Sequence, residues 1–194
     1  SLQAHSAFST LPASVQQAVR SYEPLAPSAS PSKVGLSGRR VAEAVADHAR
    51  LQGWSVETIG PMEGEARERG RELATRLLNA ECTVIFGETT VTIDREMRRG
   101  EGGRNQELAL AFAAALPVES SRVLLALATD GVDGQSSNAG AIVDAGTRGR
   151  ACKLDVAHAL VSHDAATFLE APGDALRLLA TGTNVADLTV ILGT

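Results

Sequence analysis

Four polar, glycine-rich segments of the sequence carry the side chains that could bind or transform a ligand. They span residues 87–90, 100–107, 129–140 and 181–187, and they contain hydroxyls, amides, carboxylates and a single arginine. Each follows an apolar run that is typical of a buried strand. In open α/β sheets, the loops that leave the carboxyl ends of the strands meet in one crevice, where ligands bind. The sequence therefore predicts one polar site assembled from all four segments.

Gly102 and Gly103 stand directly before Arg104, where a helical pattern begins. Glycines let the backbone approach a ligand closely, and the free N–H groups of a first helical turn attract an anion. The Arg104 guanidinium would add paired N–H donors for a phosphate or a carboxylate. The alternative is an ordinary turn in which Arg104 pairs with Glu101 or Glu107. From the residues alone, both interpretations stay open.

Several acidic and hydroxyl side chains stand where strands are expected to end. Asp130 and Asp133 follow an apolar strand, which is a common place for carboxylates that bind Mg²⁺ or take part in catalysis. They could also form turns, the interpretation that the residues alone favour, because Asp accepts hydrogen bonds from nearby backbone N–H groups. Glu88, Thr89 and Thr90 could likewise place a carboxylate and hydroxyls in a cleft, or satisfy the backbone of a tight turn.

The fourth polar segment contains Thr183 and Asn184, with Asp187 shortly after them. These side chains could bind a nucleotide. They could also cap a short helix, because Thr, Asn and Asp accept hydrogen bonds from the first N–H groups of helices. Taken alone, the pattern favours capping.

The motifs of three large enzyme classes are missing from the sequence. There is no G-x-x-x-x-G-K-[ST] stretch, and the only lysines are Lys33 and Lys153, so a P-loop enzyme is excluded. Gly100 begins a G-x-G spacing, but Asn105 stands where the third glycine of G-x-G-x-x-G would be, which disfavours a dinucleotide-dependent dehydrogenase. The absence of G-x-S-x-G gives no support to a Ser-His-Asp hydrolase.

The overall composition narrows the classes of partner. The chain has 194 residues, a net charge of −5 and 3% aromatic residues, so nucleic acids and anionic membrane surfaces are poor candidates. No apolar stretch is long enough to span a membrane, and the N-terminus lacks the pattern of a signal peptide. Cys82 and Cys152 lie far apart without zinc-ligand spacing, which indicates reduced cysteines in a cytoplasmic protein.

Apolar strand patterns alternate with amphipathic helix patterns along most of the chain. We expect strands at 33–36, 54–59, 83–86, 90–93, 123–128, 176–180 and 188–192, and helices at 39–52, 65–79, 104–116 and within 147–170. The alternation predicts a three-layer α/β/α sandwich with a mixed, mostly parallel sheet. The wholly apolar strand at 123–128 is typical of strands buried on both faces.

Residues 1–32 differ from the rest of the chain. A short helical pattern is followed by a stretch rich in proline and serine at 24–31, a composition typical of linkers. The segment is too short to fold independently. We interpret it as the tail of a missing N-terminal domain, or as an arm packed on the body, and we assign residues 33–194 to one α/β domain. The absence of an initiator Met agrees with a piece of a longer protein.

Five motifs in the same order resemble the MOFRL family. They lie at residues 87–91, 102–110, 129–134, 139–141 and 181–188. The resemblance covers about 83–194, and 33–82 is similar to the stretch that precedes it in the same proteins. The family forms the C-terminal part of class II glycerate 2-kinases, which also carry the name hydroxypyruvate reductase.

The resemblance implies a two-domain enzyme that uses ATP and Mg²⁺ to phosphorylate the 2-hydroxyl of glycerate in the cleft between its domains. This chain would form one wall and would be inactive without the missing N-terminal kinase domain. The implied catalytic residues are Arg104, Asp130 and Glu88. The implied substrate-binding or nucleotide-binding residues are Thr89, Thr90, Gly102, Gly103, Asn105, Asp133, Thr183 and Asn184. Arg104 would neutralise charge on the substrate carboxylate or the transferring phosphoryl group, and the metal ligand stays unassigned.

The chain departs from the family pattern at four places. Phe86 replaces a glycine, Leu179 and Ala180 replace a Gly-Pro pair, residues 135–137 replace a Pro-Thr pair, and 94–99 are unusually charged. Two alternative functions stay open: a standalone module that binds a small anion or regulates another protein, and an NAD(P)H-dependent hydroxypyruvate reductase. A domain separated from its neighbour would expose a former interface, which favours self-association.

Overall fold

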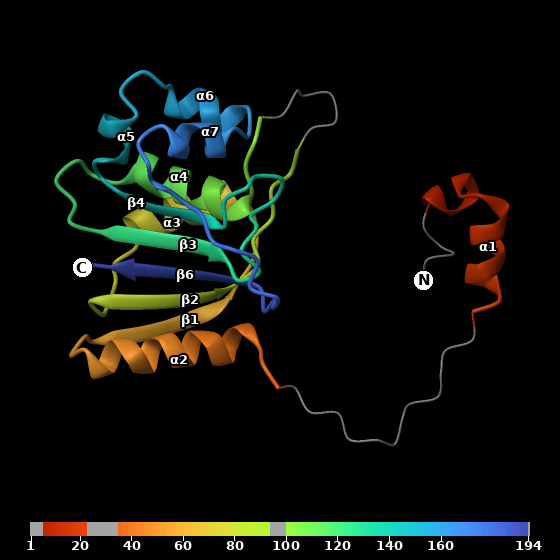
Figure 1. Ribbon diagram of the computed structural model, residues 1–194, viewed down its shortest axis with the longest axis horizontal. Helices are drawn as coiled ribbons and strands as arrows, with labels where there is room; N and C mark the ends of the chain where they lie inside the picture. The colour runs from red at the N-terminus through yellow and green to blue at the C-terminus, as the bar shows by residue number, and fades with distance from the viewer. Residues whose placement is uncertain (1–5, 23–34, 94–99, 194) are drawn as a thin grey trace. The chain divides into compact units, whose positions relative to one another are not determined.

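The computed structural model describes residues 6–22, 35–93 and 100–193 (Figure 1). The chain divides into two compact units, Ser1–Gly35 and Leu36–Thr194. The first unit holds a short 3-10 helix, η2 (Ser6–Thr10), and the helix α1 (Ala13–Arg20). The second unit holds the sheet and all the predicted site residues.

A six-stranded sheet with the order β1-β2-β6-β3-β4-β5 forms the centre of the second unit. Its strands are β1 (Val56–Met62), β2 (Cys82–Gly87), β3 (Val123–Ala128), β4 (Gly140–Asp144), β5 (Ala175–Leu176) and β6 (Asp187–Leu192). The neighbouring strands β2 and β6 are rich in Thr, Val and Ile. Branched side chains of this kind fit the pleated surface of a sheet.

The mixed α/β fold is confirmed, but the expectation of a mostly parallel sheet is wrong. β1 and β2 are parallel, whereas the other four pairings along the sheet are antiparallel. The reason lies in the path of the chain. β6 returns between β2 and β3 and runs opposite to both, and β4 follows β3 through a loop, a connection that needs no crossover helix.

Helices cover both faces of the sheet, as predicted. α2 (Gly38–Leu51) packs on one face. The other face carries α3 (Ala66–Thr75), α4 (Arg104–Ala115), α5 (Thr147–Arg150), α6 (Val156–Val161) and α7 (Ala165–Glu170). In Figure 1, α2 runs along β1 at the bottom of the sheet, and α4 to α7 lie towards the top. Among the described residues, none of these helices is both long and apolar enough to cross a membrane.

Two apolar cores hold these layers together. In the larger core, every residue of α4 from 108 to 113 is buried. α3 crosses α4 so closely that a Cβ atom on Gly70 would lie 2.2 Å from the carbonyl oxygen of Leu108. In the smaller core, Ala42 and Ala46 of α2 pack against apolar residues of β2 and β6.

Four strand ends meet at one edge of the sheet. Gly87 ends β2 and Ala128 ends β3, and both pair with Asp187, the first residue of β6. Gly140 begins β4 opposite Leu127 of β3. The loops that carry the polar segments therefore leave from, or return to, the same edge.

The expected elements differ from the observed ones in four places. Of the strand expected at 176–180, only Leu176 belongs to a strand, and 177–180 are irregular. No strand forms at 90–93, where Thr90 makes a single bridge to Glu65. Of the strand expected at 33–36, residues 35 and 36 are irregular, and 33 and 34 lie outside the described residues. β4 has no counterpart among the expected strands. β3 is also buried on one face rather than two, since its alternate residues are only half-buried.

Candidate functional site

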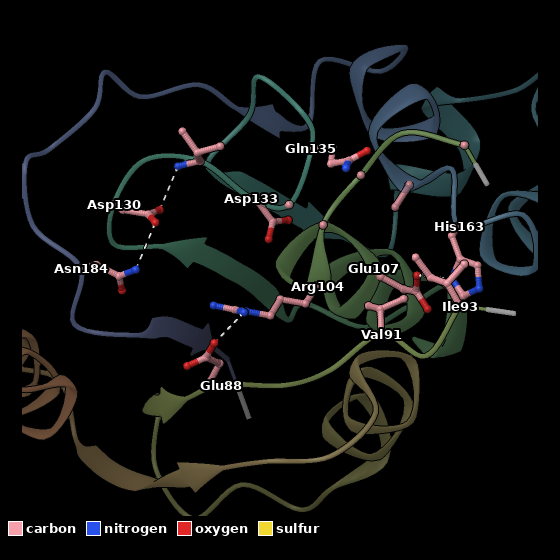
Figure 2. A pocket seen from close by; sticks show the side chains of 16 residues that line it. Glu88, Val91, Ile93, Arg104, Glu107, Asp130, Asp133, Gln135, His163 and Asn184 are labelled. Carbon is pink, nitrogen blue, oxygen red and sulfur yellow. Dashed lines mark hydrogen bonds and ion pairs between the residues drawn. The ribbon is translucent and has the colours of Figure 1, made fainter. Parts of the chain in front are cut away.

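A cleft of about 450 Å³ opens at this edge of the sheet (Figure 2). All four polar segments contribute to its lining: Glu88 from the first, residues within 100–107 from the second, Asp130 and Asp133 from the third, and Asn184 from the fourth. The segments that the sequence singles out therefore converge on one cleft.

Arg104 projects into the cleft from the first turn of α4 (Figure 2). Its Nε atom lies 2.5 Å from Asp187 Oδ2, and its Nη2 atom lies 3.1 Å from Oδ1 of the same carboxylate. Its Nη1 atom lies 2.7 Å from Glu88 Oε1. The Asp187 side chain is 7% exposed and that of Glu88 is 59% exposed. Asp187 is thus a fixed clamp, whereas Glu88 makes one accessible contact that a ligand anion could replace.

The pairing of Arg104 with Asp187 favours a charged guanidinium. The hydrogen bond from Arg104 to Asp187 raises the pKa of Arg104, against the effect of burial. Burial raises the pKa of Asp187, and the bonds from Arg104 act against that rise. The observed partners are not Glu101 or Glu107, the two residues that the turn interpretation of the sequence names. They are Asp187, which begins β6, and Glu88, which directly follows β2.

Asp133 is buried beside the start of α4 and caps this helix. Its Oδ1 atom accepts hydrogen bonds from the backbone N–H and the side-chain amide of Asn105, both at 3.1 Å. Its Oδ2 atom accepts from the N–H of Gln106 at 2.8 Å. Burial raises the pKa of Asp133 to about 6, although these hydrogen bonds lower it. The N–H groups of Asn105 and Gln106, expected to be free for an anion, are therefore already bonded to a carboxylate of the protein.

The glycines of the second segment allow loops to pack closely. A Cβ atom on Gly103 would lie 2.3 Å from the side chain of Asp133, and one on Gly100 would lie 2.3 Å from that of Asp164. Gly134 approaches from the third segment, and a Cβ atom there would lie 2.5 Å from the Gly102 carbonyl oxygen. The contacts of Gly103 and Gly134 join the second and third segments and leave Gly102 and Gly103 on the wall of the cleft.

Asp130 connects the third and fourth segments. Its Oδ1 atom accepts a hydrogen bond from the N–H of Val132 at 3.1 Å, as in an Asp turn, and its Oδ2 atom accepts one from Asn184 at 3.3 Å (Figure 2). Thr129 reinforces the connection by donating to the Ala186 carbonyl oxygen at 2.7 Å. Asp130 therefore stabilises a turn, and both Asp130 and Asn184 line the cleft.

Four of the predicted binding residues lie beside the cleft and not in its lining. Thr89 and Asn105 are buried, and Asn105 is bonded to Asp133. Thr90 donates a hydrogen bond to Glu65. Thr183 is exposed, and its carbonyl oxygen accepts a hydrogen bond from a neighbouring threonine. These residues shape the loops that carry the cleft residues.

Glu107 and His163 line the opposite end of the cleft from Asn184 (Figure 2). His163 Nδ1 lies 2.8 Å from Glu107 Oε2, and Arg67 Nε donates to Glu107 Oε1 at 2.9 Å. The sequence assigns no role to this cluster, because its members come from α3, α4 and the turn before α7, and no spacing links them. The sequence did not predict that Asp187 pairs with Arg104. Its place in the fourth polar segment is the signal that could have identified it as a site residue.

Two accessible carboxylates could serve a Mg²⁺ ion that arrives with a nucleotide. Within the described ranges, no group of three or more His, Cys, Asp or Glu side chains could hold a metal ion alone. Mg²⁺ in nucleotide sites is usually bound by one or two carboxylates together with phosphate oxygens and water. Glu88 and Asp130 line the cleft and fit that use.

Residues 81–187 match the sequence profile described as the MOFRL family, which is more than half of the 194-residue chain. This stretch contains every predicted site residue.

Named proteins are similar to most of the chain. An Agrobacterium vitis protein whose name includes hydroxypyruvate reductase is 40% identical over 68% of the chain and 32% of its own length. The D-glycerate 2-kinase of Thermotoga maritima is 35% identical over 78% of the chain and 39% of its own length. The glycerate 2-kinase of Pyrococcus horikoshii is 34% identical over 78% of the chain and 37% of its own length. The chain thus spans between 32% and 39% of these relatives.

Two crystal structures share the fold. A glycerate kinase from Thermotoga maritima superposes with a TM-score of 0.82 and 31% identity, over 95% of this chain and 47% of its own. A Pyrococcus horikoshii protein superposes with a TM-score of 0.76 and 29% identity, over 100% of this chain and 48% of its own.

Proposed function

The chain belongs to the MOFRL family, and from this premise we propose that it forms one wall of the active-site cleft of a glycerate 2-kinase. In that enzyme the γ-phosphoryl group of ATP passes to the 2-hydroxyl of glycerate. Two of the similar proteins carry the name glycerate 2-kinase. The chain would be the C-terminal portion of such an enzyme and would be inactive alone.

The observation that carries this proposal is the clamped Arg104 guanidinium facing the cleft. Phosphoryl transfer spreads negative charge over the transferring oxygens, and fixed positive groups lower its barrier. The two hydrogen bonds that Arg104 donates to Asp187 fix its orientation without covering the side that faces the cleft. When a phosphoryl or carboxylate oxygen replaces Glu88, Arg104 can donate to it with little reorganisation.

The size of the cleft agrees with a small hydroxy acid beside phosphate groups. Ligand pockets commonly have volumes of about 300–1,000 Å³, and this cleft has about 450 Å³. A three-carbon acid fills only part of that space. The remaining part, near Asp130 and Asn184, could hold phosphate oxygens.

The cleft needs further positive groups to bind ATP. Among the described residues that line it, Arg104 is the single arginine or lysine. One guanidinium does not neutralise a triphosphate. We therefore assign most of the nucleotide site to the rest of the enzyme, while Glu88 or Asp130 would hold Mg²⁺, which neutralises phosphate charge and aligns the reacting groups when bound.

A chimera tests this proposal directly. Residues 36–194 replace the matching segment of the Thermotoga maritima D-glycerate 2-kinase, and phosphorylation of glycerate by MgATP is measured. We expect the chimera to be active and the isolated chain to be inactive. Arg104→Ala in the chimera should lower kcat by about 100-fold or more, because losing one charge-stabilising donor typically costs that much.

The matched control is Arg71→Ala, because Arg71 is an exposed arginine on α3 outside the cleft. It should leave kcat within about twofold, as surface substitutions usually do. A chimera that folds, binds MgATP and yet does not phosphorylate glycerate would contradict the proposal. Equal activity of the Arg104→Ala and Arg71→Ala chimeras would contradict the role of Arg104.

A further inference from the structure

The face of the sheet that carries α2 is only partly covered. α2 packs on β1, β2 and β6 through the smaller core. Strands lie about 4.8 Å apart and a helix with its side chains is about 10 Å wide, so one helix covers about two strands. Within Leu36–Thr194, the described part of this face carries one helix for a six-stranded sheet. On this face no described helix of the unit covers β4, and of β3 only Leu127 packs against the smaller core.

An aliphatic surface lies on the uncovered part, and we name it the open sheet face. It consists of Val123, Leu125, Ile142 and Leu192. The register places them together, because Leu125 pairs with Ile142 and Val123 pairs with Leu192. Cross-strand partners of this kind have Cβ atoms about 5 Å apart. All four side chains therefore project from the same side of neighbouring strands.

The open sheet face is separate from both cores. None of its four residues belongs to either core or to the half-buried residues packed against them. Ile142 is 46% exposed and Leu192 is 36% exposed, although strand residues next to them on the opposite face, Val143 and Ile191, are fully buried. A contiguous aliphatic surface in the middle of a sheet usually marks a contact with another layer of protein.

The length of the relatives points to a source for that layer. The chain spans 39% of the Thermotoga maritima D-glycerate 2-kinase, so most of that polypeptide lies outside the matched region. We infer that an amphipathic helix from this remaining part of the enzyme packs its aliphatic side on the open sheet face. The inference rests on the proposed function in one respect, that the chain is part of a longer enzyme.

This contact would complete the third layer and fix the wall of the cleft. β3 contributes Val123 and Leu125 to the open sheet face and ends at Ala128, shortly before Asp130. A helix packed on β3 and β4 would hold the edge from which the third polar segment leaves. The same contact would therefore link assembly of the enzyme to the position of Asp130.

Cysteine labelling tests the inference. Ile142→Cys is introduced into the isolated chain and into the chimera, with Cys152, which is exposed, and any other exposed cysteine replaced by serine. A maleimide reagent should label position 142 at least tenfold more slowly in the chimera than in the isolated chain. Leu77→Cys is the control, because Leu77 is 87% exposed and lies after α3 on the other side of the sheet, and it should react equally in both.

Equal labelling of position 142 in both proteins would overturn the inference. Protection in the isolated chain that grows with protein concentration would also overturn it, by assigning the face to a second copy. An active chimera with a reactive position 142 would leave the proposed function intact and reject the interface. A protected position 142 in a chimera that binds MgATP but does not phosphorylate glycerate would support the interface and reject the function.

A second measurement covers the case in which the chimera folds poorly with cysteine at this position. Ile142→Lys should lower the Tm of the chimera by several degrees and leave that of the isolated chain nearly unchanged, because the lysine is buried only when the partner helix is present. Leu77→Lys should change neither Tm. Equal effects of Ile142→Lys on both proteins would reject the interface.

Discussion

Arg104 and Asp187 are 83 residues apart in the chain and form a two-bond ion pair at the cleft. Arg104 begins α4 and Asp187 begins β6. The pair therefore connects the start of the central helix to the edge of the sheet where the polar loops meet. Asp187 accepts hydrogen bonds from Nε and Nη2 of Arg104. The Nη1 atom therefore stays available for Glu88 or for a ligand in the cleft.

The clamp leads to a first prediction, on Asp187→Asn. The substitution keeps the shape of the side chain and removes its charge, so Arg104 stays present but loses its fixed orientation. In the chimera, kcat/KM should fall by about 10- to 100-fold, because small misplacements of a catalytic group cost up to that much. Steady-state kinetics measure the effect, and Asp187→Glu should restore part of the activity.

Asp144→Asn is the control for this prediction. Asp144 contacts Arg150 at 2.9 Å in an exposed ion pair away from the cleft. Asp144→Asn should lower the free energy of unfolding by about 1 kcal/mol or less, because its ion pair is exposed to water. Asp187→Asn should cost about 1–3 kcal/mol, because its carboxylate is only 7% exposed. If Asp144→Asn reduces activity as much as Asp187→Asn, the loss reflects folding and the positioning role of Asp187 is wrong.

The pKa of Asp133 leads to a second prediction, on stability against pH. This pKa is about 6 in the folded chain and has an ordinary value of 3.8, so between these values the folded chain binds more protons than the unfolded chain. The free energy of unfolding that Asp133 contributes should therefore fall as pH rises from about 4 to about 7. The difference between the two pKa values corresponds to about 3 kcal/mol.

Urea unfolding of the chain and of its Asp133→Asn variant at about pH 4 and about pH 7 measures this contribution. The amide cannot ionise, so the variant should lose less stability than the unmodified chain as pH rises. Asp47→Asn, at an exposed position on α2, serves as the control variant. If the chain instead gains stability relative to Asp133→Asn as pH rises, the capping bonds outweigh burial and the predicted direction of the pKa shift is wrong.

A third prediction concerns the close packing of Gly103. A Cβ atom there would lie 2.3 Å from the Asp133 side chain and 2.4 Å from its backbone carbon, so neither loop can move aside easily. Gly103→Ala should lower the free energy of unfolding by about 1–3 kcal/mol, the usual cost of overpacking. Denaturant unfolding measures the change.

Gly149→Ala provides the matched control, because a Cβ atom on Gly149 meets nothing within 4 Å and the residue lies inside the helix α5. This substitution should be neutral or stabilising by up to about 1 kcal/mol, since alanine is the better helix former. Equal destabilisation by the two substitutions would mean that the loss arises from the backbone of glycine in general and not from contact with Asp133.

The sequence predicted the cleft because its polar segments share a topological position. Glu88, Arg104, Asp130 and Asn184 each lie in a polar, glycine-rich loop, and such loops can be recognised without knowing the order of the strands. The direction of the strands could not be predicted in this way. It depends on β6 inserting between β2 and β3, and no local pattern of residues records which neighbours a strand selects.

The sequence also did not predict the hydrogen-bond partners of the site residues. Asp133 at the end of a strand is compatible with a metal ligand, a turn or a cap, and only its burial beside Asn105 and Gln106 makes it a cap. β4 escaped detection because its five residues begin with glycine and end in a charged residue. It is held in the sheet by pairing with β3, a contact made in three dimensions rather than along the chain.

A fourth prediction concerns His163, which adopts a positive φ of 52° and is bonded to the buried Glu107. Asparagine tolerates this left-handed conformation well, whereas a β-branched residue does not. His163→Val should therefore lower the free energy of unfolding by about 1–2 kcal/mol more than His163→Asn. Both variants lose the imidazole contact to Glu107, so thermal or urea unfolding of the two isolates the effect of the backbone.

His158 supplies the comparison, because it is an exposed histidine with ordinary helical geometry in α6. Asn and Val have similar helix propensities, so His158→Asn and His158→Val should differ by less than about 0.5 kcal/mol. If the two His163 variants differ no more than the two His158 variants, the left-handed turn carries no cost. His163 would then owe its place at the cleft to its contacts with Glu107 and Arg67.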